Sequence, residues 1–158
     1  MNSLAKEMPA GVRNDRNEMR LSFSAVSANE SFARTVAAAF VTGLDPTVSE
    51  IMEIKTAVSE AVTNAIIHGY DNKGKDKLVQ LNCRIEGRDL YIEVVDAGVG
   101  IQDIAKAMEP LYTSKPEHER SGMGFSVMET FMDYVNVNSE PGRGTTVLMM
   151  KKLPVSRE

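Results

Sequence analysis

The sequence predicts an α+β fold, a two-layer sandwich in which a mostly antiparallel sheet carries helices on one face. Segments that alternate apolar and polar side chains, as half-buried strands do, occur near the start, in the middle and at the end of the chain. Two segments with helical periodicity follow the first of these, and a glycine turn joins the middle ones into a hairpin. Helices and strands in this order favour helices packed on one face of an antiparallel sheet.

The chain opens with a predicted strand and a predicted helix. Apolar residues alternate with polar ones from Met19 to Val26, namely Leu21, Phe23 and Ala25. Ser27 or Asn29 can cap a helix that is expected to run to about Phe40 and that cannot continue through Pro46. Its apolar face has helical spacing and consists of Phe32, Val36, Ala39 and Phe40.

The second helix has the most regular pattern in the chain. It is expected to begin near Thr47 or Ser49 and to end at Gly69, directly after His68. Helical spacing is kept by Ile51, Ile54, Val58, Ala61, Val62 and Ala65. This face of the helix is therefore expected to be buried.

A hairpin and a long irregular segment follow. Alternation over residues 79–85 and 90–94, separated by Gly87, predicts two paired strands. Residues 96–122 contain glycine, proline and charge without periodicity, and a connection of this length is more often functional than accidental. One helix and two strands complete the chain: Gly124 to Met132, Tyr134 to Asn138 and Thr145 to Leu153.

Length, charge and cysteine content limit the possible classes of function. The 158 residues predict a single domain over 17–158, preceded by a disordered leader over 1–16. A net charge of −4 argues against direct DNA binding and against binding to an anionic membrane. Cys83, the single cysteine, cannot form an internal disulfide and is expected to be a buried, inert thiol. Since the longest apolar run, Val36 to Val41, is too short to cross a bilayer, we expect a cytoplasmic protein.

Several common nucleotide-binding motifs are absent from the sequence. Residues 69–76 nearly match a phosphate-binding P-loop, but Asp76 stands where a magnesium-binding hydroxyl is needed, so the segment is predicted to be a surface turn. No glycine triplet completes the dinucleotide-binding fingerprint. The His-Arg-Asp and Asp-Phe-Gly sequences of eukaryotic-type protein kinases do not occur either.

Two features place chemically useful side chains next to predicted secondary structure. Glu60 and Asn64, four residues apart on one face of the second helix, offer a base to a hydroxyl and an oxygen to a metal. Asp96 follows a predicted strand, where a carboxylate can accept a hydrogen bond from an exocyclic amine. Gly98 and Gly100 let a ligand approach the backbone there. Each feature has a structural alternative when it is taken alone. Glu60 and Asn64 could lie on a solvated helix face, and the segment with Gly98 and Gly100 could form an ordinary turn.

A third feature predicts a phosphate site. Ser121, Gly122 and Gly124 open the helix that follows the irregular segment, where free backbone N–H groups and the helix dipole favour phosphate. Lys115 and Arg120 precede this helix and add positive charge. The segment from Ile101 to Ser121 is therefore expected to act as a lid that orders over ATP.

Together with GRGTT over residues 142–146, these features resemble the ATP-binding superfamily that includes gyrase, the heat-shock-90 chaperones, bacterial histidine kinases and MutL, over residues 17–153. SEAVTNAIIHG over residues 59–69 and PLYTSKPEHERSGMGF over residues 110–125 are most similar to the anti-sigma factor serine kinases of sporulating bacteria. The resemblance implies a Bergerat-type ATP-binding fold. It also implies residue roles: Glu60 as general base, Asn64 as magnesium ligand, Asp96 as adenine reader, Gly98 and Gly100 as pocket wall, Lys115, Arg120, Ser121, Gly122 and Gly124 as phosphate lid, and Thr145 as a second contact near adenine.

The resemblance further implies a kinase and a binding protein in one domain. Its cofactors would be ATP and Mg²⁺, its substrate an anti-anti-sigma factor that it phosphorylates on serine, and its second partner an RNA polymerase sigma factor, sigma F, that it sequesters. Two alternatives stay open. One is an ATP-gated clamp or ATPase that modifies no protein, and the other is the general-stress type of anti-sigma kinase with a different pair of partners.

A homodimer is also implied by the resemblance. The strand from Met19 to Val26 is expected to have an unpaired edge, and such edges are commonly covered by another chain, here together with the helix that follows. Arg34 on that helix is a candidate to contact a sigma factor across the dimer. The alternative for Arg34 is a solvated helix charge without a partner role.

Overall fold

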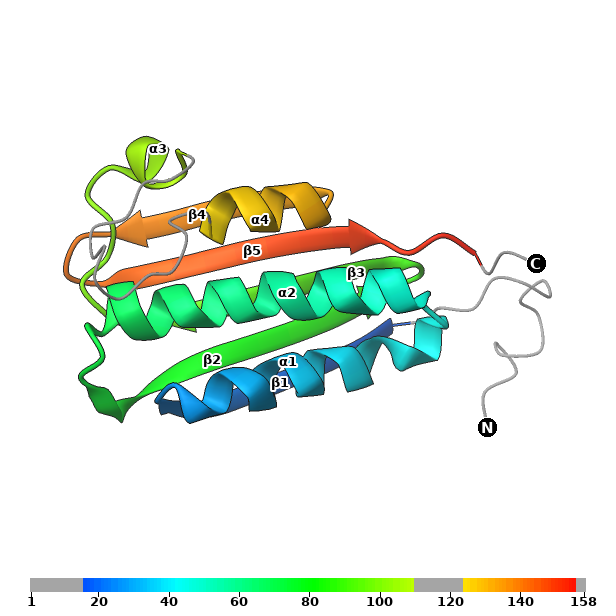
Figure 1. The fold of residues 1–158 in the computed structure, drawn as a ribbon, viewed down its shortest axis with the longest axis horizontal. Helices are drawn as coiled ribbons and strands as arrows, with labels where there is room; N and C mark the ends of the chain where they lie inside the picture. Colours follow the sequence, from blue (N-terminus) through cyan, green and yellow to red (C-terminus); the bar gives the residue numbers. More distant parts are fainter. Residues whose placement is uncertain (1–15, 110–123, 156–158) are drawn as a thin grey trace, which may run out of the picture.

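The computed structural model describes residues 16–109 and 124–155. Its strands form one five-stranded sheet in the order β1-β2-β3-β5-β4, and every neighbouring pair is antiparallel (Figure 1). The strands are β1 (Arg16–Ala25), β2 (Gly74–Glu86), β3 (Asp89–Asp96), β4 (Tyr134–Glu140) and β5 (Gly144–Lys152).

The longer helices lie side by side on one face of this sheet (Figure 1). They are α1 (Ala28–Val41), α2 (Val48–Asn64) and α4 (Gly124–Phe131). Shorter helical turns are η2 (Thr42–Leu44), the π-helical η3 (Ala65–Gly69) and α3 (Ile104–Ala107). The predicted two-layer α+β sandwich, with helices on one face of an antiparallel sheet, is therefore confirmed.

Helix α2 begins at a capping box. The side-chain oxygen of Thr47 accepts a hydrogen bond from the N–H of Glu50 at 3.1 Å, and the Glu50 carboxylate accepts one from the N–H of Thr47 at 2.9 Å. N–H groups at a helix start have no partner within the helix, so both bonds stabilise the start of α2 here. The predicted cap at Thr47 or Ser49 is thus Thr47.

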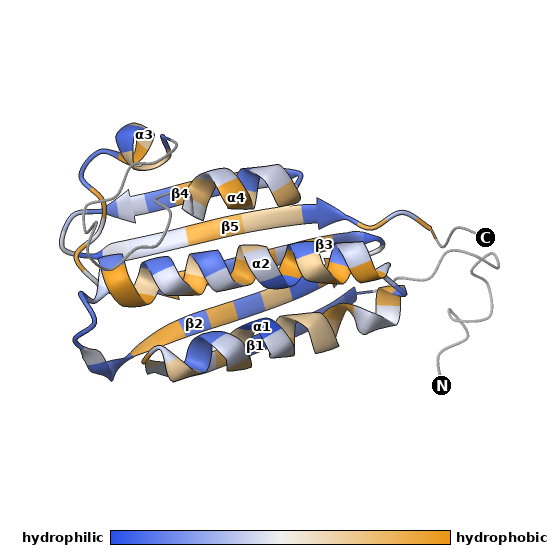
Figure 2. Ribbon diagram, in the orientation of Figure 1, coloured by the Kyte–Doolittle hydropathy of each residue, from blue (hydrophilic) through white to orange (hydrophobic). Residues whose placement is uncertain are grey.

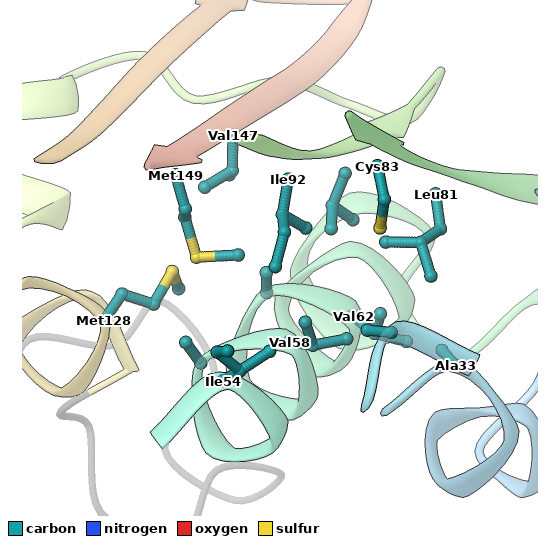
Figure 3. Packing of buried hydrophobic residues seen from close by; sticks show 14 of the residues in the cluster. Ala33, Ile54, Val58, Val62, Leu81, Cys83, Ile92, Met128, Val147 and Met149 are labelled. Carbon is teal, nitrogen blue, oxygen red and sulfur yellow. The ribbon is translucent and has the colours of Figure 1, made fainter. Parts of the chain in front are cut away.

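The core lies between the helices and the inner face of the sheet. Every second side chain is buried from Val79 to Ile85 of β2 and throughout β3, as the alternation predicts, and bands of alternating hydropathy colour the β2 ribbon in Figure 2. In Figure 3, Ile54 and Val58 of α2 face Ile92 and Met149 of the sheet, and all four are fully buried. Burial of such side chains contributes roughly 1.5–3 kcal/mol each, so this layer stabilises the whole sandwich.

Cys83 lies in this core, with 1% of its surface exposed. Burial raises the pKa of its thiol to about 12, because a thiolate would be desolvated there. The predicted inert thiol is confirmed, since the thiolate is the reactive form.

The buried face of α1 differs from the prediction. The residues that α1 buries are Ala33, Ala37 and Val41, whereas Phe32 is 49% exposed. Alanines four residues apart allow the helix to approach its neighbours closely, which a phenylalanine on that face would prevent. Phe40 packs against the core as predicted, and Val36 is partly buried. The prediction was wrong for Phe32 and Ala39, because it ranked positions by hydrophobicity and left out the space available to each side chain.

The ends of some elements also differ. β1 begins at Arg16 instead of Met19 and pairs with β2 from there to Ala25, while the leader before it lies outside the described residues. Within the segment expected to be irregular, α3 forms where the Asp103 carboxylate accepts a hydrogen bond from the N–H of Lys106 at 3.1 Å. The surface turn predicted over 69–76 is shorter than expected: residues 70–72 form it, Gly69 ends η3, and β2 begins at Gly74 instead of residue 79.

Candidate functional site

Glu60 and Asn64 lie near the end of α2, beside the first residue of α4. Both side chains are half-buried at the edge of the apolar face of α2. A methyl group added to Gly124 would lie 3.2 Å from Asn64 Nδ2 and 3.3 Å from Glu60 Oε2. The structure therefore brings a carboxylate, a carboxamide and a helix N-terminus together, and a side chain at position 124 would crowd both polar groups.

The π-helical turn η3 follows Asn64 directly, and its last residue, Gly69, lies beside the Asp96 side chain. Such turns widen the helix by one residue and frequently occur at functional sites. The helical segment ends at Gly69 as predicted, but Gly69 is not among the residues with positive φ and so does not form the usual left-handed cap. A methyl group at Gly69 would lie 2.8 Å from Asp96 Oδ1. This glycine thus leaves room for the Asp96 carboxylate.

Asp96 is the last residue of β3, and only 7% of it is exposed. Its Oδ1 accepts a hydrogen bond from the N–H of Gly98 at 2.9 Å, and the backbone of Thr145 provides a second bond. Burial raises the pKa of Asp96 from 3.8 to about 6, and these two bonds lower it only in part. A carboxylate kept in such a desolvated place is a candidate for binding a hydrogen-bond donor of a ligand.

Asp96, Thr145 and Ser139 form one row across β3, β5 and β4. The strand register pairs Asp96 with Thr145 and Thr145 with Ser139, so the three side chains point to the same face of the sheet. Thr145 is 8% exposed, and its Oγ1 lies 2.8 Å from Ser139 Oγ. Ser139 was not predicted as a site residue from the sequence. A serine in line with the inward-facing Val137 was the available signal.

The rim loop, residues 97–101, is held by hydrogen bonds to residues 69–70 on one side and to Ser139 of β4 on the other. Its N–H groups donate to these acceptors: Ala97 to Tyr70 Oη at 2.7 Å, Val99 to the Gly69 carbonyl at 2.9 Å, and Ile101 to Ser139 Oγ at 2.8 Å. Tyr70 in turn donates its hydroxyl proton to the Leu78 carbonyl at 2.8 Å. Tyr70 was not identified from the sequence either, because its partners lie on other elements.

Gly98 and Gly100 were predicted to let a ligand approach the backbone, and the backbone of the protein itself also approaches both of them closely. A methyl group at Gly98 would overlap the carbonyl oxygen of Gly69. One at Gly100, whose φ is 75°, would overlap the carbonyl oxygen of Glu140. Both glycines are therefore required by packing of the rim loop, which holds the backbone after Asp96 in place.

The other predicted phosphate residues, Lys115, Arg120, Ser121 and Gly122, lie outside the described residues. Gly124 is described and lies beside Glu60 and Asn64. The structure thus places one end of the predicted lid, where α4 begins.

The described side chains suit ATP and magnesium. Asp96 and Thr145 can accept hydrogen bonds from a base, and the amide oxygen of Asn64 is a hard ligand of the kind magnesium prefers. Within residues 16–109 and 124–155, no three His, Cys, Asp or Glu side chains cluster closely enough to hold a metal ion. Magnesium commonly takes only one or two protein oxygens and completes its shell with nucleotide phosphates and water, so a single amide ligand fits it.

In the part of the chain that the structure describes, no helix has the length and apolar character needed to span a membrane.

Comparison with known proteins identifies relatives over most of the chain. The family model for the histidine kinase-like ATPase domain matches residues 23–151. An anti-sigma F factor from Clostridium acetobutylicum is 61% identical over 136 residues, which cover 86% of this chain and 94% of that protein. One from Oceanobacillus iheyensis is 56% identical over 142 residues, which cover 90% of this chain and 97% of that protein.

A solved structure shares the fold. The RsbU and RsbW domains of Rv1364c from Mycobacterium tuberculosis superpose with a TM-score of 0.64 over 90% of this chain and 34% of that chain, at 16% identity. The matched residues 23–151 contain the Glu60–Asn64 pair and the Asp96–Thr145–Ser139 row. The chain therefore belongs to the histidine kinase-like ATPase family and, within it, to the anti-sigma F factors.

Proposed function

We propose that this chain is a cytoplasmic protein serine kinase that also sequesters an RNA polymerase sigma factor of the sigma F type. The names of relatives that are 61% and 56% identical support a sigma factor as partner, and the family match supports ATP as cofactor. The observation that carries the enzymatic part is the Glu60–Asn64 pair beside the N-terminus of α4. Buried Asp96 lies at the same end of the sandwich, against Gly69.

Asp96 and Thr145 hold the adenine in this proposal. The ionised carboxylate accepts a hydrogen bond from the exocyclic amine, and the threonine hydroxyl makes a second contact. Asn64 provides the magnesium ligand. When bound, magnesium neutralises charge on the phosphates and so eases phosphoryl transfer.

Glu60 acts as the general base. It accepts the proton of the substrate serine hydroxyl while the hydroxyl oxygen bonds to the γ-phosphorus and the bond to the leaving ADP breaks. The first N–H groups of α4 stabilise the phosphate charge that develops. From the sequence resemblance, Lys115, Arg120, Ser121 and Gly122 would add to this stabilisation.

Transfer of labelled phosphate from ATP to the anti-anti-sigma protein tests this proposal. The anti-anti-sigma protein is expected to be labelled on serine with magnesium present and not after chelation. ATP binding without labelling would favour the ATP-gated clamp. Labelling of only a general-stress antagonist would favour the other branch of anti-sigma kinases.

Arg34 lies in a polar cluster between α1 and α2. Its Nη1 is 3.6 Å from Glu30 Oε1 and 3.5 Å from Ser59 Oγ, and Glu30 Oε2 accepts a hydrogen bond from Thr63 Oγ1 at 3.0 Å. The Arg34 side chain is 40% exposed. Its guanidinium is thus held next to the residue before Glu60, with part of it open to a partner. We propose that β1, an edge strand of the sheet, pairs two such chains in a homodimer.

Replacing Arg34 by Ala is expected to weaken capture of the sigma factor at least about tenfold, a typical loss for an arginine at the centre of an interface. ATP affinity should stay unchanged, because Arg34 bonds to none of the adenine-site residues. Calorimetry with each ligand measures both, and Lys152→Ala, which removes an exposed cation at the far end of β5, is the control.

Light scattering of the same samples gives the mass of the complex. Two copies of this chain with one sigma factor are expected. Unaltered sigma binding by Arg34→Ala would make Arg34 an ordinary helix charge, and a monomeric wild type at micromolar concentration would contradict the homodimer.

A further inference from the structure

We infer that Ser139 is a positioning residue that fixes the Thr145 hydroxyl as a hydrogen-bond acceptor and thereby makes the site select 6-aminopurines over 6-oxopurines. The inference rests on the proposed function, because it takes Asp96 and Thr145 as the groups that contact the base. To the proposed function it adds a residue, Ser139, that acts without contacting the nucleotide, and a physical reason why the site selects one base over another.

The Ser139 hydroxyl lies within hydrogen-bond distance of three groups. Ile101 N is 2.8 Å away, the Gly144 carbonyl oxygen 3.0 Å, and Thr145 Oγ1 2.8 Å. Two of these partners are backbone groups of the rim loop and of β5. Their positions follow from the fold, so the orientation of Ser139 is fixed independently of Thr145.

The direction of each bond follows from the number of protons available. A serine hydroxyl has one proton to donate and two lone pairs that accept. The N–H of Ile101 can only donate, so it uses one lone pair of Ser139 Oγ. The carbonyl of Gly144 can only accept, so it takes the proton of Ser139. One lone pair of Ser139 then remains for Thr145, and Thr145 must be the donor of the bond between the two hydroxyls.

Thr145 therefore directs its only proton away from the base and presents lone pairs. Asp96 is its direct neighbour in the register, and its ionised carboxylate also offers lone pairs alone. The two side chains form a surface of acceptors. The exocyclic amine of adenine has protons to donate to such a surface, so a 6-aminopurine complements it.

A 6-oxopurine is rejected by this arrangement. Inosine can still offer its N1–H to the Asp96 carboxylate, but its O6 then faces the lone pairs of Thr145. Without Ser139 the Thr145 hydroxyl is free to rotate and can donate its proton to O6. Loss of Ser139 should therefore improve inosine binding relative to adenine binding.

The test compares ATP and inosine triphosphate by calorimetry at pH 8, where Asp96 with its pKa of about 6 is ionised. In Ser139→Ala, the preference for ATP over inosine triphosphate is expected to fall about three- to tenfold, the worth of one hydrogen bond. Ser139→Thr keeps a hydroxyl at this position and is expected to restore the preference. Ser49→Ala, which changes an exposed serine near the start of α2, is the matched control.

A purely structural role for Ser139 has a different outcome. In that case Ser139→Ala would lower the melting temperature and weaken the binding of both nucleotides by the same factor. This result would overturn the inference and leave the proposed function intact. An unchanged preference in Ser139→Ala would overturn it equally. Failure of the wild-type protein to bind ATP would refute the proposed function itself.

Discussion

Replacing Glu60 by Ala is expected to slow phosphoryl transfer to the anti-anti-sigma protein by about 10²–10⁴, the usual contribution of a general base. ATP affinity should remain nearly unchanged, because in the proposed site Asp96 and Thr145 hold the adenine and Asn64 holds the metal. Single-turnover transfer of labelled phosphate measures the rate, and calorimetry measures the affinity.

Two further variants distinguish loss of the general base from loss of the metal ligand and from loss of a surface charge. Asn64→Ala should weaken both Mg-ATP binding and transfer, because it removes the proposed metal ligand. Glu129→Gln, which neutralises an exposed carboxylate on α4, should behave like wild type. Equal transfer rates in wild type and Glu60→Ala would rule out Glu60 as the base.

Replacing Asp96 by Ala is expected to weaken ATP binding at least about tenfold. A hydrogen bond to a charged group contributes about 1.5–3 kcal/mol, and the acceptor would be lost from a buried position. Asp76→Asn, which changes a carboxylate exposed on β2, is the control. ATP affinity like that of wild type in Asp96→Ala would remove Asp96 from the site.

The raised pKa of Asp96 predicts opposite pH dependences for ATP affinity and stability. In the proposed site its ionised form binds the amine, so wild-type ATP affinity should fall as the pH drops below about 6. Between pH 3.8 and about 6, this carboxyl holds more protons in the folded chain than in the unfolded chain. Its contribution to the free energy of unfolding therefore decreases by about 3 kcal/mol as the pH rises through this range.

Asp96→Asn separates these two effects. It is expected to stabilise the free protein at pH 8 by about 1–3 kcal/mol in denaturant unfolding, because no charge is then desolvated, and to weaken ATP binding. If the variant were less stable than wild type at this pH, other interactions in the free protein would have to compensate for the cost of burying the Asp96 charge.

Local sequence patterns were sufficient for the fold and for where the candidate site residues Glu60, Asn64, Asp96 and Thr145 lie in it. Alternation and helical spacing are properties of neighbouring residues, so they placed the strands, α2 and the Glu60–Asn64 pair. The position of Asp96 at a strand end and of Thr145 on the final strand followed in the same way. Asp96 lies beside Thr145 because β3 pairs with β5. This pairing does not follow from the predicted hairpin and the order of the strands in the chain alone.

Features that depend on distant partners were not predictable in this way. Ser139 bonds to Ile101, 38 residues away, and Tyr70 bonds to Ala97, 27 residues away. Neither residue looks unusual among its neighbours in the chain. The face of α1 was wrong for a related reason, because the tight fit at Ala33 and Ala37 is set by the elements against which α1 packs.

The rim-loop glycines have a consequence for how this family evolves. Gly98 and Gly100 are required by backbone carbonyls of the same chain, so selection for a folded protein alone would retain them. Asp96 is different, since its buried charge lowers the stability of the free chain at neutral pH. A lineage released from selection for nucleotide binding should keep the glycines and drift first at Asp96, so the carboxylate, not the glycine pair, distinguishes active descendants from degenerate ones.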